Sequence, residues 1–149
     1  MRKGVDIYTD GACSGNPGAG GWCSILIYNN HEKIISGFEN YTTNNRMELL
    51  AVVKGLKELK ESCYVSVYSD SAYVTNAFIL GWINYWRSHE WYTKSRNEVK
   101  NRDLWEALIE ESEKHIVNII KVKGHSDNLY NIRCDEIAKS EIVKNTKNN

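Results

Sequence analysis

The hydrophobic pattern of this 149-residue chain changes its period once, near residue 42. Before that point, residues 5–10, 21–28 and 33–40 are rich in strand-forming side chains and are joined by short turns. Three such segments in succession predict an antiparallel meander. After it, segments of strand type alternate with segments of helix type, which predicts a mixed sheet with helices packed on it. The predicted fold class is therefore α/β, in the sense of an α+β mixed sheet.

The second part of the chain is predicted to contain two strands and several helices. The strands are residues 63–69 and 116–122, which are short and rich in β-branched and aromatic side chains. Apolar stripes and capping residues predict helices at 46–60, 72–80, 82–86, 103–114 and 133–144. The polar segments 87–98 and 124–131 are expected to be loops, and the tail 145–149 is expected to be frayed or disordered.

Composition restricts the class of protein further. With 42% apolar and 26% charged residues, the chain is typical of a globular protein, and its length fits one domain, residues 1–149. No apolar run reaches the ~20 residues of a membrane span. Residues 1–6 contain no apolar segment, so we expect no signal peptide. A net charge of zero gives no sign of a simple electrostatic nucleic-acid binder. The four cysteines form no Cys-x-x-Cys pair, so we expect a cytoplasmic protein with free thiols and no zinc.

Two predicted strands end on the same pattern, in which a tyrosine and a small polar residue precede an aspartate. The two segments are residues 8–10 and 68–70. If these strands are parallel neighbours, Asp10 and Asp70 lie side by side at one end of the sheet, where α/β folds place ligands. Glu48 lies on the inward-facing stripe of the first predicted helix, where an unpaired carboxylate is costly.

Each acidic residue also has an ordinary structural explanation. A strand-end aspartate is most often a turn or cap residue, Asp135 could interact with a helix dipole, and Glu48 could pair with Arg46 or a nearby lysine. His125 lies in a polar loop and could be structural. Several carboxylates at one point nevertheless favour a hard divalent cation such as Mg²⁺, which takes oxygen ligands. The glycine-rich segment 11–21 has neither the phosphate-loop nor the dinucleotide-binding pattern.

Four sets of motifs occur in order along the chain. The first is Thr-Asp-Gly-Ala-Cys-Ser-Gly-Asn-Pro-Gly at 9–18, and the second is Thr-Thr-Asn-Asn-Arg-Met-Glu-Leu at 42–49. The third is Ser-Asp-Ser at 69–71, and the fourth joins Lys-Gly-His at 123–125 to Arg-Cys-Asp-Glu at 133–136. Together these motifs resemble bacterial ribonuclease H of type 1 over essentially residues 5–140.

The resemblance implies a ribonuclease H-like fold: a five-stranded mixed sheet, with its first three strands antiparallel, flanked by helices. It implies a monomeric endonuclease that hydrolyses the RNA strand of RNA–DNA hybrids, leaving 3′-hydroxyl and 5′-phosphate ends. Two Mg²⁺ ions, or Mn²⁺ in their place, would act with the substrate. By position, His125 matches a loop histidine that assists proton transfer or product release. The matching metal-binding carboxylates are Asp10, Glu48, Asp70 and Asp135.

The resemblance further implies a set of residues that contact the hybrid. Some match the groove where 2′-hydroxyls identify RNA, two match a pocket for a phosphate of the DNA strand, and two tryptophans match the DNA-strand channel. Core packing for the tryptophans and turn formation for the asparagines are the alternatives. The groove residues are Cys13, Asn16, Asn44 and Asn45, the pocket residues are Thr43 and Asn101, the channel residues are Trp82 and Trp86, and Asn76 completes the set.

The chain departs from the family pattern in its basic region. Bacterial members of the family usually carry a strongly basic helix and loop in this region. Here, residues 86–103 contain five basic and three acidic residues. We therefore expect substrate binding that is weaker and less sensitive to salt than a lysine-rich region would give. Ala72 also stands where a glutamine is common. Two alternatives remain open: a non-catalytic hybrid-binding module, disfavoured by the four carboxylates, and a DNA-cutting relative of the same fold, disfavoured by the groove residues.

Overall fold

The computed structural model describes residues 1–123 and 128–146. The strands within them are β1 (Lys3–Ser14), β2 (Gly18–Tyr28), β3 (His31–Thr42), β4 (Cys63–Ser69) and β5 (Ile116–Lys121). The helices are α1 (Asn44–Lys57), α2 (Ala72–Ile79), α3 (Trp82–Ser88), α4 (Arg102–Glu113) and α5 (Leu129–Thr146). None of these helices is both long enough and apolar enough to cross a membrane.

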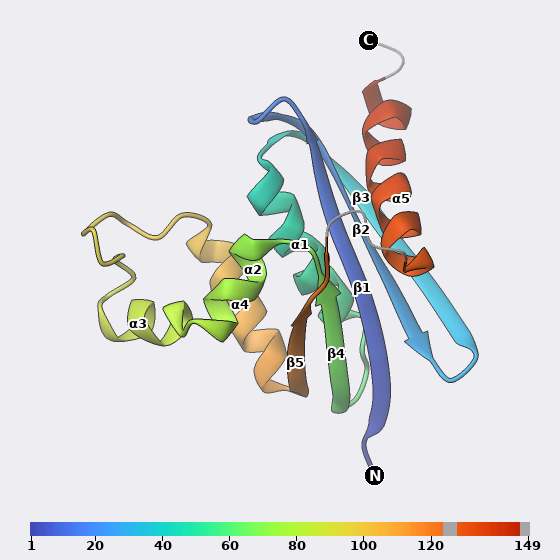
Figure 1. Cartoon of the computed structure of the whole chain (residues 1–149), viewed down its shortest axis with the longest axis horizontal. Helices are drawn as coiled ribbons and strands as arrows, with labels where there is room; N and C mark the ends of the chain where they lie inside the picture. The colour runs from blue at the N-terminus through green and yellow to red at the C-terminus, as the bar shows by residue number, and fades with distance from the viewer. Residues whose placement is uncertain (124–127, 147–149) are drawn as a thin grey trace.

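The described strands form one mixed sheet in the order β3-β2-β1-β4-β5 (Figure 1). The first three are antiparallel, as the meander pattern predicts, and β4 runs parallel to both β1 and β5. Tyr8 of β1 is the register partner of Tyr68 of β4. Since these strands are parallel neighbours, the aspartates two residues further along meet at the same edge, as the sequence predicts.

The two faces of the sheet carry separate hydrophobic clusters. Alternation along β1 directs Ile7 into the larger cluster, under α1 and α4, and Tyr8 into the smaller one, under α5. In Figure 1, α5 lies over β1–β3, whereas α2, α3 and α4 lie toward the β4–β5 side. The carboxylate edge is therefore held between α1 on one face and α5 on the other.

The glycine-rich segment is largely part of a β-hairpin. β1 continues through Ser14 and β2 begins at Gly18, so only residues 15–17 form the turn. Packing requires glycine at position 11, because a Cβ atom there would lie 2.5 Å from the backbone nitrogen of Glu48. Because glycine has no Cβ, the start of α1 can rest against β1. This close approach brings Glu48 beside the end of the predicted strand.

The last helix begins earlier than predicted. The Oδ1 atom of Asn128 accepts hydrogen bonds from the backbone nitrogens of Tyr130 (2.9 Å) and Asn131 (3.4 Å), which is the pattern of a helix N-cap. The prediction of a loop up to residue 131 is therefore wrong for 129–131, where α5 has already started. The helix extends to Thr146, two residues into the tail that was expected to be frayed.

Candidate active site

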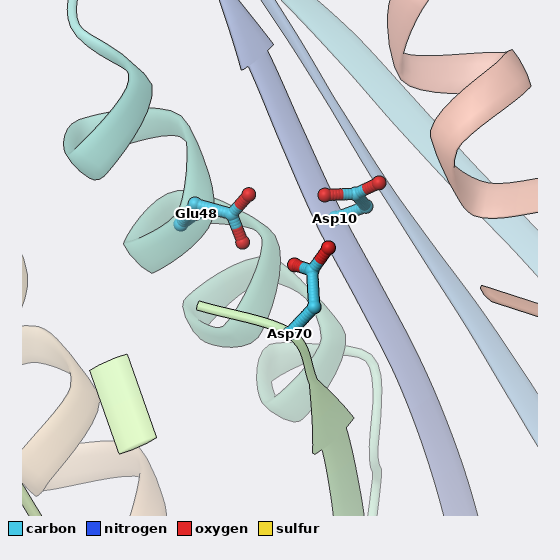
Figure 2. Close-up of side chains that lie close together, drawn as sticks. All are labelled: Asp10, Glu48 and Asp70. Atoms are coloured by element: carbon cyan, nitrogen blue, oxygen red, sulfur yellow. The ribbon is translucent and has the colours of Figure 1, made fainter. Parts of the chain in front are cut away.

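Three carboxylates from distant parts of the sequence converge at the sheet edge. Asp10 lies in β1, Glu48 lies in α1, and Asp70 directly follows β4. One oxygen from each lies within 4.8 Å of the others, and Figure 2 shows the three groups pointing toward one another. This confirms that the matching strand ends and the inward-facing position in the first helix place these residues together.

Local backbone geometry fixes two of the three groups. The side chain of Thr43 caps α1 by accepting a hydrogen bond from the backbone nitrogen of Arg46 at 3.2 Å. The backbone nitrogen of Gly11 donates to Asp10 Oδ1 at 2.9 Å and to Glu48 Oε1 at 3.1 Å. One amide thus holds two carboxylates from different elements. The alternative that Glu48 pairs with Arg46 does not occur, because Arg46 pairs with Asp103.

The electrostatics of the cluster are unfavourable without a cation. Asp10 is 8% exposed and Glu48 is 3% exposed. Burial, together with the nearby charges of Asp70 and Asp135, raises the pKa of Asp10 to about 7. Burial and the charge of Asp10 raise the pKa of Glu48 well above its usual range. Among the described residues, the buried Oε2 atom of Glu48 has no hydrogen-bond partner. A buried set of oxygen ligands of this kind fits a hard divalent cation.

Asp135 lies on the wall of the same pocket. It lies in α5, lines the pocket together with the three converging carboxylates, and contributes to the raised pKa of Asp10. Its own carboxylate pairs with Lys139, one turn later, at 3.0 Å and is 43% exposed. Within the described residues it is therefore a fourth acidic group beside the cluster of three. His125 lies outside the described residues.

Several predicted RNA-groove residues lie beside the carboxylates. Cys13, Asn44 and Asn45 line the same pocket. Asn16, at the tip of the hairpin, accepts a hydrogen bond from the backbone nitrogen of Asn44 at 3.0 Å. The hairpin and the start of α1 are therefore held together, and three of these four polar residues share the pocket with the carboxylates.

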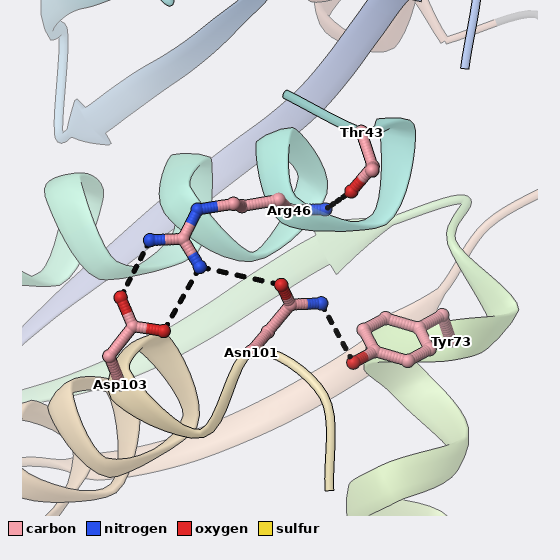
Figure 3. A network of polar contacts seen from close by, with 5 residues as sticks. All are labelled: Thr43, Arg46, Tyr73, Asn101 and Asp103. Atoms are coloured by element: carbon pink, nitrogen blue, oxygen red, sulfur yellow. Dashed lines mark hydrogen bonds and ion pairs between the residues drawn. The ribbon is translucent and has the colours of Figure 1, made fainter. Parts of the chain in front are cut away.

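The predicted phosphate-pocket residues belong to a polar network (Figure 3). Arg46 pairs with Asp103 through contacts of 2.9 and 2.6 Å, and it also donates to Asn101 Oδ1 at 3.4 Å. Asn101 Nδ2 donates in turn to the hydroxyl of Tyr73 at 3.2 Å. Thr43 caps the helix that carries Arg46. The structure thus joins Thr43 and Asn101 through Arg46, and the network continues from Asn101 to Tyr73.

The remaining predicted contact residues are placed differently from one another. Trp86 is only 7% exposed and packs edge-on against Trp105 at 5.2 Å, so core packing accounts for most of its surface. Trp82 is half-buried and lines an apolar pocket with Lys94. Asn76 is half-buried in α2 and, within the described chain, does not line the carboxylate pocket.

Two residues of this site were not identified from the sequence. Lys139 and Tyr73 both line the carboxylate pocket. The signal for Lys139 was its spacing, because a lysine four residues after Asp135 shares a helix face with it. Tyr73 offered only its closeness to Asp70 in the sequence, and its partners lie in α4 and directly before that helix.

By fold, the chain resembles solved ribonuclease H structures. The structure of LC9-RNase H1 superposes with a TM-score of 0.86 at 24% identity, covering 98% of this chain and 75% of that one. LC11-RNase H1 in complex with RNA/DNA hybrid gives a TM-score of 0.72 at 21% identity, covering 95% and 98%. These likenesses show a ribonuclease H-like fold, and the chain's own acidic cluster is able to hold a metal ion.

The sequence comparisons identify the family. The RNase H family model matches residues 2–143. Ribonuclease H of Acetivibrio thermocellus is 59% identical over 147 residues, covering 99% of each chain. Ribonuclease H of Thermoanaerobacter sp. (strain X514) is 57% identical over 145 residues, covering 97% of this chain and 94% of that one. The chain belongs to the ribonuclease H family, as the motifs predict, and it is an enzyme.

Proposed function

We propose that this enzyme hydrolyses the RNA strand of RNA–DNA hybrids by a two-metal-ion mechanism, leaving 3′-hydroxyl and 5′-phosphate ends. The observation that carries the proposal is the convergence of Asp10, Glu48 and Asp70 within 4.8 Å, with Asp135 on the wall of the same pocket. A protein of the same fold in complex with RNA/DNA hybrid supports the choice of substrate.

The four carboxylates are the groups that would hold the cations. Two Mg²⁺ ions, or Mn²⁺, would lower the pKa of the attacking water and neutralise the leaving oxygen. Asp10 and Glu48 supply rigid ligand positions because a single backbone amide fixes both. Asp135, half-exposed and paired with Lys139 on the wall of the same pocket, would complete the ligand set. His125 accepts or returns a proton at the reacting end, or assists release of the product.

Recognition of the RNA strand is assigned to the polar surface beside the carboxylates. Asparagine side chains and backbone groups suit a 2′-hydroxyl, which both donates and accepts hydrogen bonds. Cys13, Asn44 and Asn45 line the carboxylate pocket, and Asn16 is fixed against Asn44. A DNA strand offers no such hydroxyl, so this surface favours cleavage of RNA over cleavage of DNA.

The DNA strand is assigned to the other side of the site. Thr43 and Asn101 would bind one of its phosphates, next to the guanidinium of Arg46. Trp82 would contact the strand through its exposed part, with Trp86 supporting it from the core at a ring separation of 6.3 Å. Asn76 is the least supported member of the set, because it does not line the described carboxylate pocket.

We also propose that residues 1–149 act as one catalytic domain, in the cytoplasm and as a monomer. The four cysteines are all free thiols, which a reducing compartment preserves. Size-exclusion chromatography with light scattering tests the monomer.

The decisive experiment is cleavage of matched RNA–DNA, RNA–RNA and DNA–DNA duplexes of one sequence, with Mg²⁺ and with a chelator. We expect cleavage of the hybrid alone, on its RNA strand and only with the cation. End-labelling of the products then identifies the 3′-hydroxyl and 5′-phosphate ends. Cutting of the DNA duplex, or cutting in the chelator, would overturn the proposal.

A further inference from the structure

The hydroxyl of Tyr73 joins the carboxylate pocket to the phosphate-pocket network. Tyr73 lies in the first turn of α2, three residues after Asp70, and lines the pocket that holds the carboxylates. Its hydroxyl accepts hydrogen bonds from Trp105 Nε1 at 3.0 Å and from Asn101 Nδ2 at 3.2 Å. It donates to the carbonyl oxygen of Lys100 at 3.4 Å.

This hydroxyl uses its full hydrogen-bonding capacity. A tyrosine hydroxyl has one donor hydrogen and oxygen lone pairs that accept, and here it makes one donated and two accepted bonds. Trp105 is fully buried and its ring lies 5.4 Å from the Tyr73 ring, so the aromatic pair fixes the position of the hydroxyl. Of the partners of Tyr73, Trp105 lies in α4 and Lys100 and Asn101 lie directly before that helix, whereas Tyr73 itself comes from α2.

The side chain of Asn101 is oriented from both ends. Its Oδ1 atom accepts from Arg46 and its Nδ2 atom donates to Tyr73. Asn101 precedes α4 with a left-handed backbone (φ 61°) and makes no side-chain capping bond to the helix. Its amide is therefore held by these two neighbours instead of by its own helix. In the described part of the chain, the second hydrogen on Nδ2 has no partner.

We infer that Tyr73 is a positioning residue for the DNA strand, acting through Asn101. This inference rests on the proposed binding of a DNA-strand phosphate by Asn101. By holding one hydrogen of Nδ2, the Tyr73 hydroxyl prevents rotation of the amide and leaves the other hydrogen directed for a phosphate oxygen. Because Tyr73 lies three residues from Asp70 in the chain, it also ties this contact to the position of the carboxylates.

The test is a double-mutant cycle with Tyr73→Phe and Asn101→Ala, measured on an RNA–DNA hybrid in saturating Mg²⁺. Tyr73→Phe keeps the ring and removes only the hydroxyl. We expect KM to rise roughly threefold to tenfold, the effect of one hydrogen bond, with kcat within about twofold of wild type. In the Asn101→Ala background, the same substitution should leave KM unchanged, because its target is absent.

Tyr68→Phe is the matched control. Tyr68 lies in β4, two residues before Asp70, and its hydroxyl bonds to Asp6 at 3.5 Å and not to Asn101. We expect its KM to be unchanged. A KM increase that adds independently to that of Asn101→Ala, or a lower melting temperature with no change in KM, would overturn the inference. If Asn101→Ala itself leaves KM unchanged, the assignment of the phosphate pocket fails. If wild-type protein does not cleave the hybrid, the proposed function fails.

Discussion

A single backbone amide, that of Gly11, donates to carboxylates from two different elements. This arrangement requires α1 to approach β1 more closely than any residue with a side chain allows. At the residue scale, Glu48 can occupy its position only because Gly11 has no Cβ atom. The sequence indicated that Glu48 faces inward. The need for glycine at position 11 could not be predicted, because it arises from a contact between residues 37 positions apart.

Gly11→Ala should separate the two carboxylates. Its Cβ would meet backbone atoms, which cannot rotate away, so we expect a loss of about 1–3 kcal/mol in the free energy of unfolding and at least a tenfold loss of kcat. Urea denaturation and steady-state kinetics measure the two effects. Gly4→Ala is the control, because nothing lies within 4 Å of a Cβ at that position. Equal behaviour of the two variants would contradict this account.

Asp10→Asn should abolish cleavage of the hybrid while leaving the fold intact. The substitution keeps the shape of the side chain but removes a charge from a buried acidic cluster. In chelator at pH 8, we expect the free energy of unfolding to increase by on the order of 1 kcal/mol or more. Thermal denaturation with and without Mg²⁺ measures this. Wild-type turnover would show that Asp10 is no metal ligand.

The pH dependence of the metal-free protein follows from the raised pKa of Asp10. The folded-state pKa of about 7 lies above the ordinary value of 3.8, so the folded state holds a proton that the unfolded chain has released. This stabilising contribution is present below about pH 4 and is lost as the pH rises through 7. In chelator, the stability advantage of Asp10→Asn over wild type should therefore grow between pH 5 and pH 8. A constant difference would contradict the assignment.

At the scale of elements, acidic residues of α4 pair with two of the five basic residues that lie from α3 to the start of α4. Arg87 pairs with Glu113 at 3.6 Å, and Arg102 pairs with Glu106 at 2.9 Å. Lys94 lies over the ring of Tyr85, with its Nζ atom 5.4 Å from the ring centroid. These two ion pairs with acidic residues of α4 reduce the effective positive charge of residues 86–103 below the value counted from the sequence.

Binding of the hybrid should accordingly depend weakly on salt. Each phosphate neutralised by a lysine or arginine contributes about one unit to the slope of log Kd against log salt concentration. We expect Lys94→Ala to reduce the slope by about one and Arg87→Ala to reduce it less, because Arg87 already has an acidic partner. Fluorescence anisotropy in Ca²⁺ or chelator measures the slope without cleavage. A steep wild-type slope would contradict the expectation.

The elements differ in how well the sequence predicted them. The strand ends at Asp10 and Asp70 and the inward stripe of α1 follow from local periodicity, so they could be predicted. The start of α5 could not be predicted, because the capping residue Asn128 lies in a polar segment whose composition is equally typical of a loop. The Tyr73–Asn101 contact depends on the packing of α2 against α4, which no local pattern records.

At the scale of the whole molecule, the acidic cluster exists only when the sheet is assembled. Asp10 and Asp70 meet because β1 and β4 pair in parallel, a contact between strands about 60 residues apart. The unfolded chain cannot collect these groups, so a divalent cation should bind the native state selectively. The motifs of the sequence identified the family and the fold, but the packing that joins the acidic cluster to the phosphate pocket required the structure.

Mg²⁺ should therefore raise the melting temperature of wild-type protein in a concentration-dependent manner. Differential scanning fluorimetry across a Mg²⁺ titration measures the shift. Asp10→Asn should show a much smaller shift, while Gly4→Ala should behave like wild type. An equal shift in Asp10→Asn would place the cation elsewhere.

The continuation of β1 past Asp10 has a geometric consequence for the position of the cut. The same unbroken strand carries both Asp10 and, three residues later, Cys13, which we propose contacts the RNA strand. At about 3.3 Å per residue, that stretch measures roughly 10 Å. In the proposed function, β1 therefore fixes the distance between the carboxylate at the reacting phosphate and the side chain at the sugar of the RNA strand. One inserted residue would lengthen it and turn Cys13 to the opposite face.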